Sequence, residues 1–269
     1  MTEQAQLSPA SQWILSRYIA LEQELENNLV QYNFGQSVDS LYSFLWDDLA
    51  DWYIEYLKTD ASQLAFGKSL FQQFVITLSP YLPFETEVLW QEFFHQDTVL
   101  AKVIKDPDWT SKFQLNSQEI HNFQLVVDFV KQLRSLRGVF GIDPSKLMQV
   151  FTSSPIWLVS TDFIRLVAKV EIIDDQRPEL YTAQIQNNQY EIDVLAHIQD
   201  LAKEIARSNK NLADLDKQIS ALESQLNNQD FINRAEADVI AQKRYDLNSR
   251  IADRDQIRSS LAFLNGVKN

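Results

Sequence analysis

Cysteine is absent from this sequence of 269 residues, and the chain has only five glycines and seven prolines. The lack of cysteine excludes a disulfide framework, a thiol nucleophile and a cysteine–zinc site, and it fits a reducing compartment. Few glycines and prolines, together with 45% hydrophobic residues, favour a helix-rich globular protein over a β-sandwich or a disordered chain. The length is enough for one large or two modest domains.

Long apolar runs are also missing. No stretch approaches the ~20 apolar residues of a membrane helix. Residues 1–30 carry acids and amides where a secretory signal would have a basic start and an apolar core. We therefore expect a cytoplasmic protein with no membrane partner.

Positive charge is scarce in the first part of the chain. Residues 1–192 hold 13 Lys and Arg against 25 Asp and Glu, whereas residues 193–269 hold eleven against twelve, and the net charge is −13. An acidic chain is a poor general binder of nucleic acid. We expect no DNA partner, and any RNA binding must depend on local patches.

Residues and motifs typical of catalysis are missing as well. The three histidines are isolated from other metal-ligating residue types, and no glycine-rich phosphate loop occurs. We expect no catalytic residue, no metal site and no cofactor in this chain. The remaining class of function is binding.

Ser37–Lys58 is the stretch around which the first part of the chain is organised. Read as a regular helix, it carries one broad apolar stripe, and Asp47, Asp51 and Glu55 recur on another face. The stripe comprises Val38, Leu41, Tyr42, Leu45, Leu49, Trp52, Tyr53 and Tyr56. Other helices must surround this hub helix to bury it, so the sequence predicts a bundle.

Capping residues and prolines delimit the neighbouring helices. These helices are expected from Ser8-Pro9 to near Tyr32, from Asp60 to Pro80, over Glu85–Phe94, and from Asn116 to Leu136. Residues 145–191 differ, because short β-branched and aromatic segments alternate with turn residues there, which indicates a small mixed α/β unit. The segments are Leu147–Thr152, Ile156–Ser160, Val167–Ile173, Tyr181–Gln186 and Tyr190–Ile192, with Thr161 as the cap of one helical turn.

A heptad seam begins after Ile192. Leucines and isoleucines step by four and three from Leu201 to Leu226, and a weaker seam resumes at Ile240 after a polar interruption. One loop-like interruption between two long helices predicts an antiparallel hairpin. The alternative is a dimeric coiled coil.

Trp13 and Arg17 lie one turn apart on the first helix, so they can share a face. An aromatic ring beside an arginine can stack an unpaired base and hold its phosphate. The alternative is that Trp13 belongs to the core. Arg134 and Arg137 form another same-face pair, which could instead complement the dipole of their helix end.

Cations also follow the C-terminal helices. Lys203, Arg207 and Lys210 line one stripe and alternate with acids, a pattern typical of a solvated coiled-coil flank. Arg234 and Arg244 lie in the most basic part, at the turn and on the return helix.

Three motifs follow one another in the first part: SQWILSRY at 11–18, YNFGQSVDSLYSFLWDDLADWYIEYLK at 32–58 and SPYLPFETEVLWQ at 79–91. Their order resembles the anticodon-binding helical domain of class I aminoacyl-tRNA synthetases with aliphatic specificity. QLRSLRG at 132–138 resembles a helix end that usually reads Ile-Arg-x-x-Arg-Ala-Glu in that family.

The C-terminal hairpin resembles the tRNA-binding arm of valyl-tRNA synthetases, through IDVLAHIQDLAKEI at 192–205 and QLNNQDFINRAEADVIAQKRYDL at 225–247. The tip of that arm normally reads Leu-x-Asn-x-x-Phe-x-x-Lys-Ala-Pro-x-x-Val. The matching positions are Leu226, Asn228, Phe231, Arg234, Ala235 and Val239, while Glu236 replaces the proline.

The resemblance implies a mainly α fold in three parts. An anticodon-binding helix bundle occupies residues 1–137, a small α/β connector 138–191, and an antiparallel coiled-coil arm for the outer corner of tRNA-Val 192–269. The tRNA contacts that it implies are Trp13, Arg17, Lys58, Arg134, Arg137, Lys203, Arg207, Lys210, Arg234 and Arg244.

The resemblance also implies what this chain would need from elsewhere. The His-x-Gly-His and Lys-Met-Ser-Lys-Ser motifs of the catalytic domain do not occur in the sequence. We expect the chain to be inactive alone, with ATP and magnesium belonging to a catalytic part of valyl-tRNA synthetase supplied in trans.

The rival interpretation is a synthetase-derived protein–protein interaction module that has lost tRNA binding, which the charge of −13 and the thin basic arm favour. The family's first bundle helix, with its Asn-x-x-Arg-Phe motif, is not found. We therefore expect an exposed apolar patch between the helix that begins at Ser8 and the hub helix.

Overall fold

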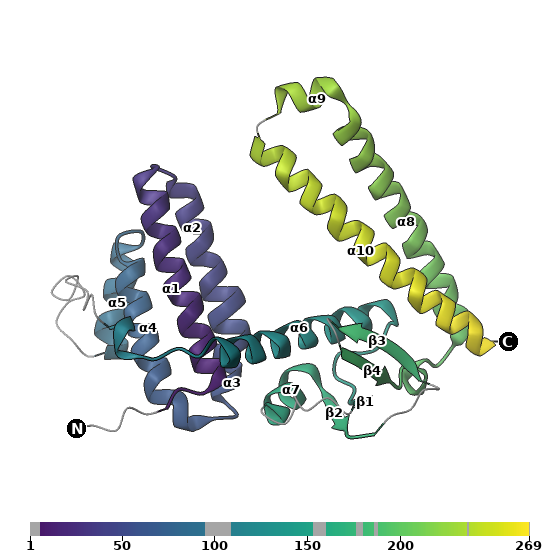
Figure 1. The fold of residues 1–269 in the computed structure, drawn as a ribbon, viewed down its shortest axis with the longest axis horizontal. Helices are drawn as coiled ribbons and strands as arrows, with labels where there is room; N and C mark the ends of the chain where they lie inside the picture. The colour runs from purple at the N-terminus through teal and green to yellow at the C-terminus, as the bar shows by residue number, and fades with distance from the viewer. Residues whose placement is uncertain are drawn as a thin grey trace. The chain divides into compact units, whose positions relative to one another are not determined.

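The computed structural model describes residues 6–94, 109–152, 160–175, 180–185, 188–235 and 237–268. Two compact units emerge, Met1–Phe129 with Ile156–Val167 and Val130–Pro155 with Ala168–Asn269. The first unit is helical, and the second joins a small sheet to a long helical hairpin (Figure 1). The expected mainly α fold class is confirmed.

The first unit is a helical bundle whose capped ends agree with the sequence. Its elements are α1 (Pro9–Val30), α2 (Phe34–Ser43), a π-helical segment (Phe44–Ile54), α3 (Glu55–Leu57), α4 (Leu64–Leu78), α5 (Pro83–Phe94), the first part of α6 (Ser117–Val139) and most of α7 (Thr161–Ala168). At Ser8, Asp60 and Asn116 a side-chain oxygen accepts a hydrogen bond from a backbone N–H near the helix start, at 3.2, 3.1 and 2.9 Å.

The hub helix differs from the regular helix that the sequence predicted. It begins at Phe34 rather than Ser37, and its middle is π-helical over Phe44–Ile54. A π-helical stretch has more residues per turn than an α-helix, so it rotates the faces that follow it relative to those before it. As a result, Val38 and Tyr42 of the predicted buried stripe are 52% and 62% exposed.

Aromatic side chains fill the core of the first unit. Trp52, Tyr56 and Phe123 come from the hub helix and α6, and all three meet the ring of Phe163 on α7, at centroid distances of 6.4, 5.7 and 5.6 Å. These rings are buried, so α7 closes the bundle although Phe163 follows Tyr56 of the hub helix by 107 residues in the chain.

A four-stranded sheet opens the second unit, in the order β2-β1-β4-β3. Its strands are β1 (Met148–Phe151), β2 (Val170–Ile173), β3 (Tyr181–Ile185) and β4 (Asn188–Ile192). β1 pairs parallel with β2 and antiparallel with β4, and β3 and β4 pair antiparallel. The predicted mixed unit is confirmed at these strands, whereas residues 156–159 lie outside the described residues, and α7 is longer than the single turn expected at Thr161.

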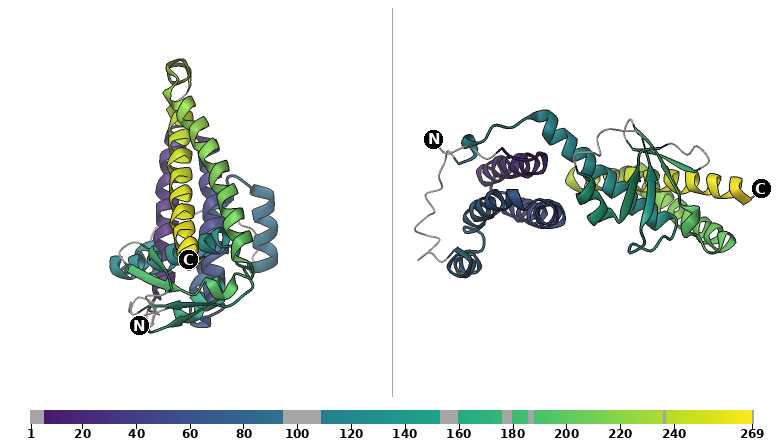
Figure 2. Two further views of the ribbon diagram at one scale, coloured as in Figure 1. Left: turned by 90° about the vertical axis from the view of Figure 1, so that its right-hand side faces the viewer. Right: turned by 90° about the horizontal axis from the view of Figure 1, so that it is seen from below.

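The hairpin consists of α8 (Leu201–Asn227), a short α9 (Gln229–Arg234) and α10 (Ala237–Lys268). α8 and α10 run side by side in opposite directions, with α9 at the tip (Figures 1 and 2). Ile219, Ile257, Leu261 and Leu264 are buried along the seam. The antiparallel hairpin is confirmed over the dimeric alternative, because the chain pairs its own seam.

Candidate nucleic-acid interface

Trp13 is a core residue. Its side chain is 2% exposed, its Nε1 donates to Gln124 Oε1 at 2.8 Å, and its ring lies 5.4 Å from that of Phe123. Both the ring and the N–H are satisfied inside the bundle. The interpretation of Trp13 as core, which the sequence left open, is confirmed, and its ring is not presented to a base.

Arg17 is half exposed but already paired. Its Nε donates to Asp48 Oδ2 at 2.8 Å, and the exposed fractions of the two side chains are 50% and 12%. Both line a groove of about 310 Å³ between α1 and α2 that also carries Glu24 and Asp39. A phosphate in this groove would meet more negative than positive charge.

The lining of this groove tests the prediction of an exposed apolar patch between the first helix and the hub helix. The prediction is wrong for the groove itself, because an ion pair and two further acids line it. Exposed apolar side chains are present nearby, but they belong to the last residue of α1, the turn after it and α2, at Val30, Tyr32, Phe34, Val38 and Tyr42.

Lys58 and Arg134 are exposed cations of the helical part. Lys58 Nζ lies 2.5 Å from Glu55 Oε1, and the lysine side chain is 57% exposed. Surface pairs at this spacing contribute little to stability, so such a lysine can exchange its partner for another anion. Arg134 lies on the exposed side of α6.

Arg137 is buried and serves the fold. It is 4% exposed, and its guanidinium donates to the carbonyl oxygens of Asp143, Ala168 and Lys169 at 3.1, 3.0 and 2.8 Å. Burial lowers its pKa, and the charge of Asp143 opposes that shift. The candidate assignment of Arg137 to tRNA is corrected, because its donors tie the end of α6 to the turn that follows it and to the residues just before β2.

Arg207 has a similar structural position at the base of the hairpin. Its guanidinium donates to the carbonyls of Gly138 and Val139 at the end of α6 and is held by the Glu204 carboxylate. Gly141 follows with φ +61°, and a Cβ there would lie 2.9 Å from Glu204 Oε2. Glycine is therefore required at position 141 for two reasons. Its φ is positive, and the Arg207–Glu204 pair lies too close for a side chain.

Lys203, Lys210, Arg234 and Arg244 are all exposed on the hairpin. The described residues offer none of them an ion pair, whereas Arg250, Arg254 and Arg258, farther from the tip on α10, are paired with acids. Positive charge free to meet an anion therefore occurs near the tip, at Arg234 and Arg244, and near the start of α8, at Lys203 and Lys210.

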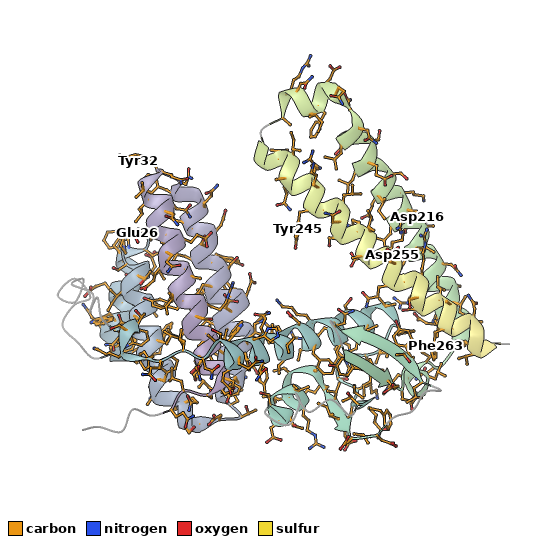
Figure 3. The ribbon with its side chains drawn as sticks, in the orientation of Figure 1. Glu26, Tyr32, Asp216, Tyr245, Asp255 and Phe263 are labelled. Carbon is orange, nitrogen blue, oxygen red and sulfur yellow. The ribbon has the colours of Figure 1, made fainter. Side chains whose placement is uncertain are left out.

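Tyr245 is a residue that the sequence reasoning missed. Its side chain is 71% exposed and projects from α10 away from α8 (Figure 3). It follows Arg244 directly, so the distal part of the hairpin exposes both an aromatic ring and a guanidinium, which point in different directions from α10. The available signal was an aromatic residue outside the heptad seam that resumes at Ile240.

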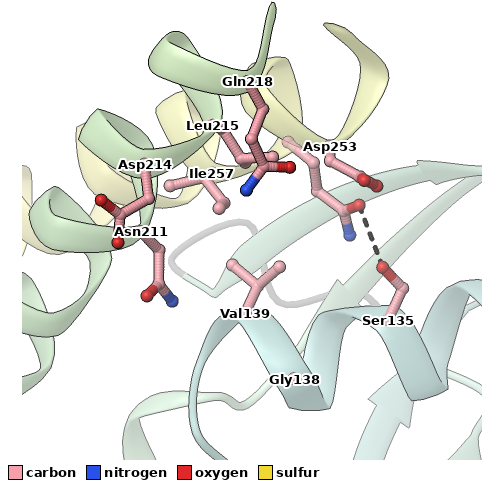
Figure 4. Close-up of a pocket in the computed structure, with 10 residues that line it drawn as sticks. Ser135, Gly138, Val139, Asn211, Asp214, Leu215, Gln218, Asp253 and Ile257 are labelled. Carbon is pink, nitrogen blue, oxygen red and sulfur yellow. Dashed lines mark hydrogen bonds between the residues drawn. The ribbon is translucent and has the colours of Figure 1, made fainter. Parts of the chain in front are cut away.

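A cleft of about 350 Å³ at the base of the hairpin has the opposite character. Asn211, Asp214 and Gln218 of α8 line it together with Asp253 of α10, and Ser135 Oγ of α6 donates to the neighbouring Gln256 (Figure 4). Its charged lining groups are acidic, which disfavours a phosphate. Among the described residues, no group of three or more metal-ligating side chains occurs, and no described helix has the length and hydrophobicity to cross a bilayer.

Comparison with known families supports this division of the molecule. Residues 11–152 match the model of the anticodon-binding domain of tRNA ligase. The chain belongs to this family. Residues 200–265, which cover nearly the whole hairpin, match a second model, the valyl tRNA synthetase tRNA binding arm.

Curated relatives give the same combination. The chain is 25% identical to the valine–tRNA ligase of Syntrophotalea carbinolica over 96% of its own length and 30% of the relative's. Identity to the Deinococcus radiodurans enzyme is 26% over 98% and 29%, and to that of Bacillus subtilis 25% over 96% and 31%. The chain therefore spans about a third of these relatives and corresponds to their C-terminal part.

Proposed function

We propose that this chain is the tRNA-binding portion of a valine–tRNA ligase and that it binds tRNA-Val. The observation that carries the proposal is one chain that joins an anticodon-binding domain to a valyl-type arm. Exposed cations near the tip of that arm, which have no ion-pair partner in the described part of the chain, support it. Phosphate contacts from Arg234 and Arg244 would position the RNA, and Tyr245 offers a ring for stacking.

The helical unit contributes the anticodon side of this proposal. A shallow pocket of about 340 Å³ runs along α1 and α6 and is lined by Arg17, Ser117, His121 and Gln124 among others. Hydroxyl, imidazole and amide groups of this kind can read the edges of unpaired bases. Trp13 and Arg137 are used inside the protein. We therefore infer that the bundle contacts RNA through Lys58 and through Arg17 at this pocket, and not in the acidic groove that Arg17 also lines.

Aminoacylation would then need a catalytic part in trans, and that part would bind ATP and magnesium. We infer that both parts work in the cytoplasm, where translation occurs. The chain alone is expected to form no valyl-tRNA, and restoration of activity by a separately expressed catalytic part would support the split arrangement.

A mobility-shift or filter-binding assay tests the proposal directly. The full chain is titrated against tRNA-Val and against an unrelated tRNA, at about 50 and 200 mM salt, because phosphate contacts weaken steeply over this range. Tighter binding to tRNA-Val at both salts is expected. Equal binding to both tRNAs, or none, would contradict it and favour an interaction module that has lost tRNA binding.

A further inference from the structure

Large apolar side chains stand exposed in one row along α2 and the start of the π-helical segment. Phe34, Val38, Tyr42 and Trp46 follow one another at four-residue spacing and are 54%, 52%, 62% and 53% exposed. The rings of Tyr42 and Trp46 contact each other at a centroid distance of 6.2 Å. This α2 row is about 18 Å long at the helical rise per residue.

The α2 row is separated from the core by the geometry of its own helix. Leu41 of α2 and Phe44 at the start of the π-helical segment are both 3% exposed, and Leu49 and Trp52 farther along that segment are 3% and 2% exposed. The change of helical phase leaves the row facing outward. A contiguous exposed apolar surface of this kind is typical of a docking site.

The charge around the row decides what kind of partner it fits. Residues 18–57 contain eight Asp and Glu and no Lys or Arg. Asp39 and Asp47 follow Val38 and Trp46 directly, are exposed, and have no cation partner among the described residues. A polyanion would be repelled from such a surface, which argues against a base-stacking role for Tyr42 and Trp46.

We propose that the α2 row docks an amphipathic α-helix of a basic polypeptide partner. Apolar residues of that helix at positions i, i+4 and i+7 would pack on Phe34, Val38, Tyr42 and Trp46. Lys or Arg residues beside its apolar stripe would pair with Asp39 and Asp47. This interaction does not rest on tRNA binding and uses a different part of the chain.

A synthetic helical peptide provides the probe. It carries leucines at helical spacing over about 18 residues, with lysines beside the stripe, and a fluorescent label reports its anisotropy on titration with the full chain. A second peptide is identical except that glutamates replace the lysines. The lysine peptide is expected to bind at least about tenfold more tightly, and the difference is expected to shrink with salt.

Two variants locate the binding site. The double variant Tyr42→Ser/Trp46→Ser removes two exposed rings, and we expect it to weaken the lysine peptide by at least about tenfold. Phe84→Ser is the matched control, since Phe84 is an 82% exposed ring on α5, and it should leave binding unchanged. Circular dichroism checks that each variant is folded, and tRNA affinity should be equal in all three proteins.

Several outcomes would overturn the proposal. These are equal binding of the two peptides, equal weakening by Phe84→Ser, or competition by a single-stranded oligonucleotide for the same site. Self-association of the wild-type chain that Tyr42→Ser/Trp46→Ser abolishes, seen by sedimentation velocity, would instead assign the α2 row to a second copy of this chain. If tRNA binding fails while the peptide result holds, only the proposed function is contradicted.

Discussion

The two helical hairpins of this chain, α1 with α2 and α8 with α10, differ in what they bury and what they leave exposed. The first packs aromatic rings into a core and leaves an apolar row flanked by acids. The second has a narrow aliphatic seam and is tied at its base by Arg207. Near its tip it carries exposed cations for which the described residues offer no ion pair. Similar secondary structure therefore provides two unlike surfaces, one suited to a basic polypeptide and the other to phosphates.

Trp13 on α1 and Trp46, just after α2, give the largest contrast in stability, because the first is buried and the second exposed. Trp13→Ala should lower the free energy of unfolding by about 3–5 kcal/mol, because it leaves a cavity beside Phe123. Trp46→Ala removes an equally large side chain that is 53% exposed and should cost under about 1 kcal/mol. Urea unfolding followed by far-UV circular dichroism measures both, and similar losses would contradict the assignment of Trp13 to the core.

Arg137 and Arg134 on α6 test the same contrast between a buried and an exposed side chain in the second unit. Arg137→Ala removes three hydrogen bonds to carbonyl oxygens and should cost about 3 kcal/mol, because hydrogen bonds to charged groups are strong and the buried acceptors lose their partner. Arg134→Ala, at an exposed position three residues earlier, should cost under about 1 kcal/mol. Chemical denaturation of the two variants decides this, and an Arg137→Ala protein as stable as wild type would refute the structural role.

Gly141, beside Arg207 and Glu204 at the base of the hairpin, tests whether the backbone there requires glycine. Gly141→Ala should destabilise the base of the hairpin by about 1–2 kcal/mol, because its φ of +61° lies where a side chain is disfavoured. Gly266→Ala on α10 is the control, since a Cβ there meets nothing within 4 Å. Hydrogen exchange at the start of α8 should rise only in the first variant.

Substitution of Asp60 should have the smallest effect on the free energy of unfolding, and this effect should depend on pH. The Ser62 hydroxyl, followed by smaller contributions from Tyr56 and the Ser62 N–H, lowers the pKa of Asp60 below its usual value. The ionised form is therefore stabilised in the folded state. Its contribution is present above the unfolded pKa of about 3.9 and is lost as the pH falls through the lower folded pKa.

Asp60→Ala should accordingly cost about 1 kcal/mol at neutral pH, as for other N-cap residues. The difference from wild type should narrow as the pH falls below about 4. Stability curves at several pH values measure this. A difference that grows on acidification would contradict the stated direction of the pKa shift.

Local signals in the sequence predicted much of this fold. The caps at Ser8, Asp60 and Asn116, four of the predicted strand segments and the heptad seam each depend on neighbouring residues, and the structure confirms them. The fifth segment, from Ile156, lies outside the described residues except for Ser160. The phase change in the hub helix was not predictable, because a π-helical stretch depends on packing around it. The assumption of a regular helix therefore placed Val38 and Tyr42 in the core.

The candidate site was predicted less well, for a related reason. Residue type and spacing cannot separate a cation that binds carbonyls inside the protein from one that faces solvent. Arg137 and Arg134 differ by three residues, yet one is buried and the other exposed. Tyr245 was visible as an aromatic outside the seam, but only its exposure makes it a candidate.

The dependence of tRNA-Val affinity on salt tests the central claim most directly. Wild type is compared with Arg234→Ala/Arg244→Ala and with the control Arg258→Ala, whose arginine is paired with Asp216 and Asp255. Each lost phosphate contact should reduce the slope of log affinity against log salt by about one, so the double variant should lose about two and the control close to none. Equal slopes for all three proteins would contradict the account.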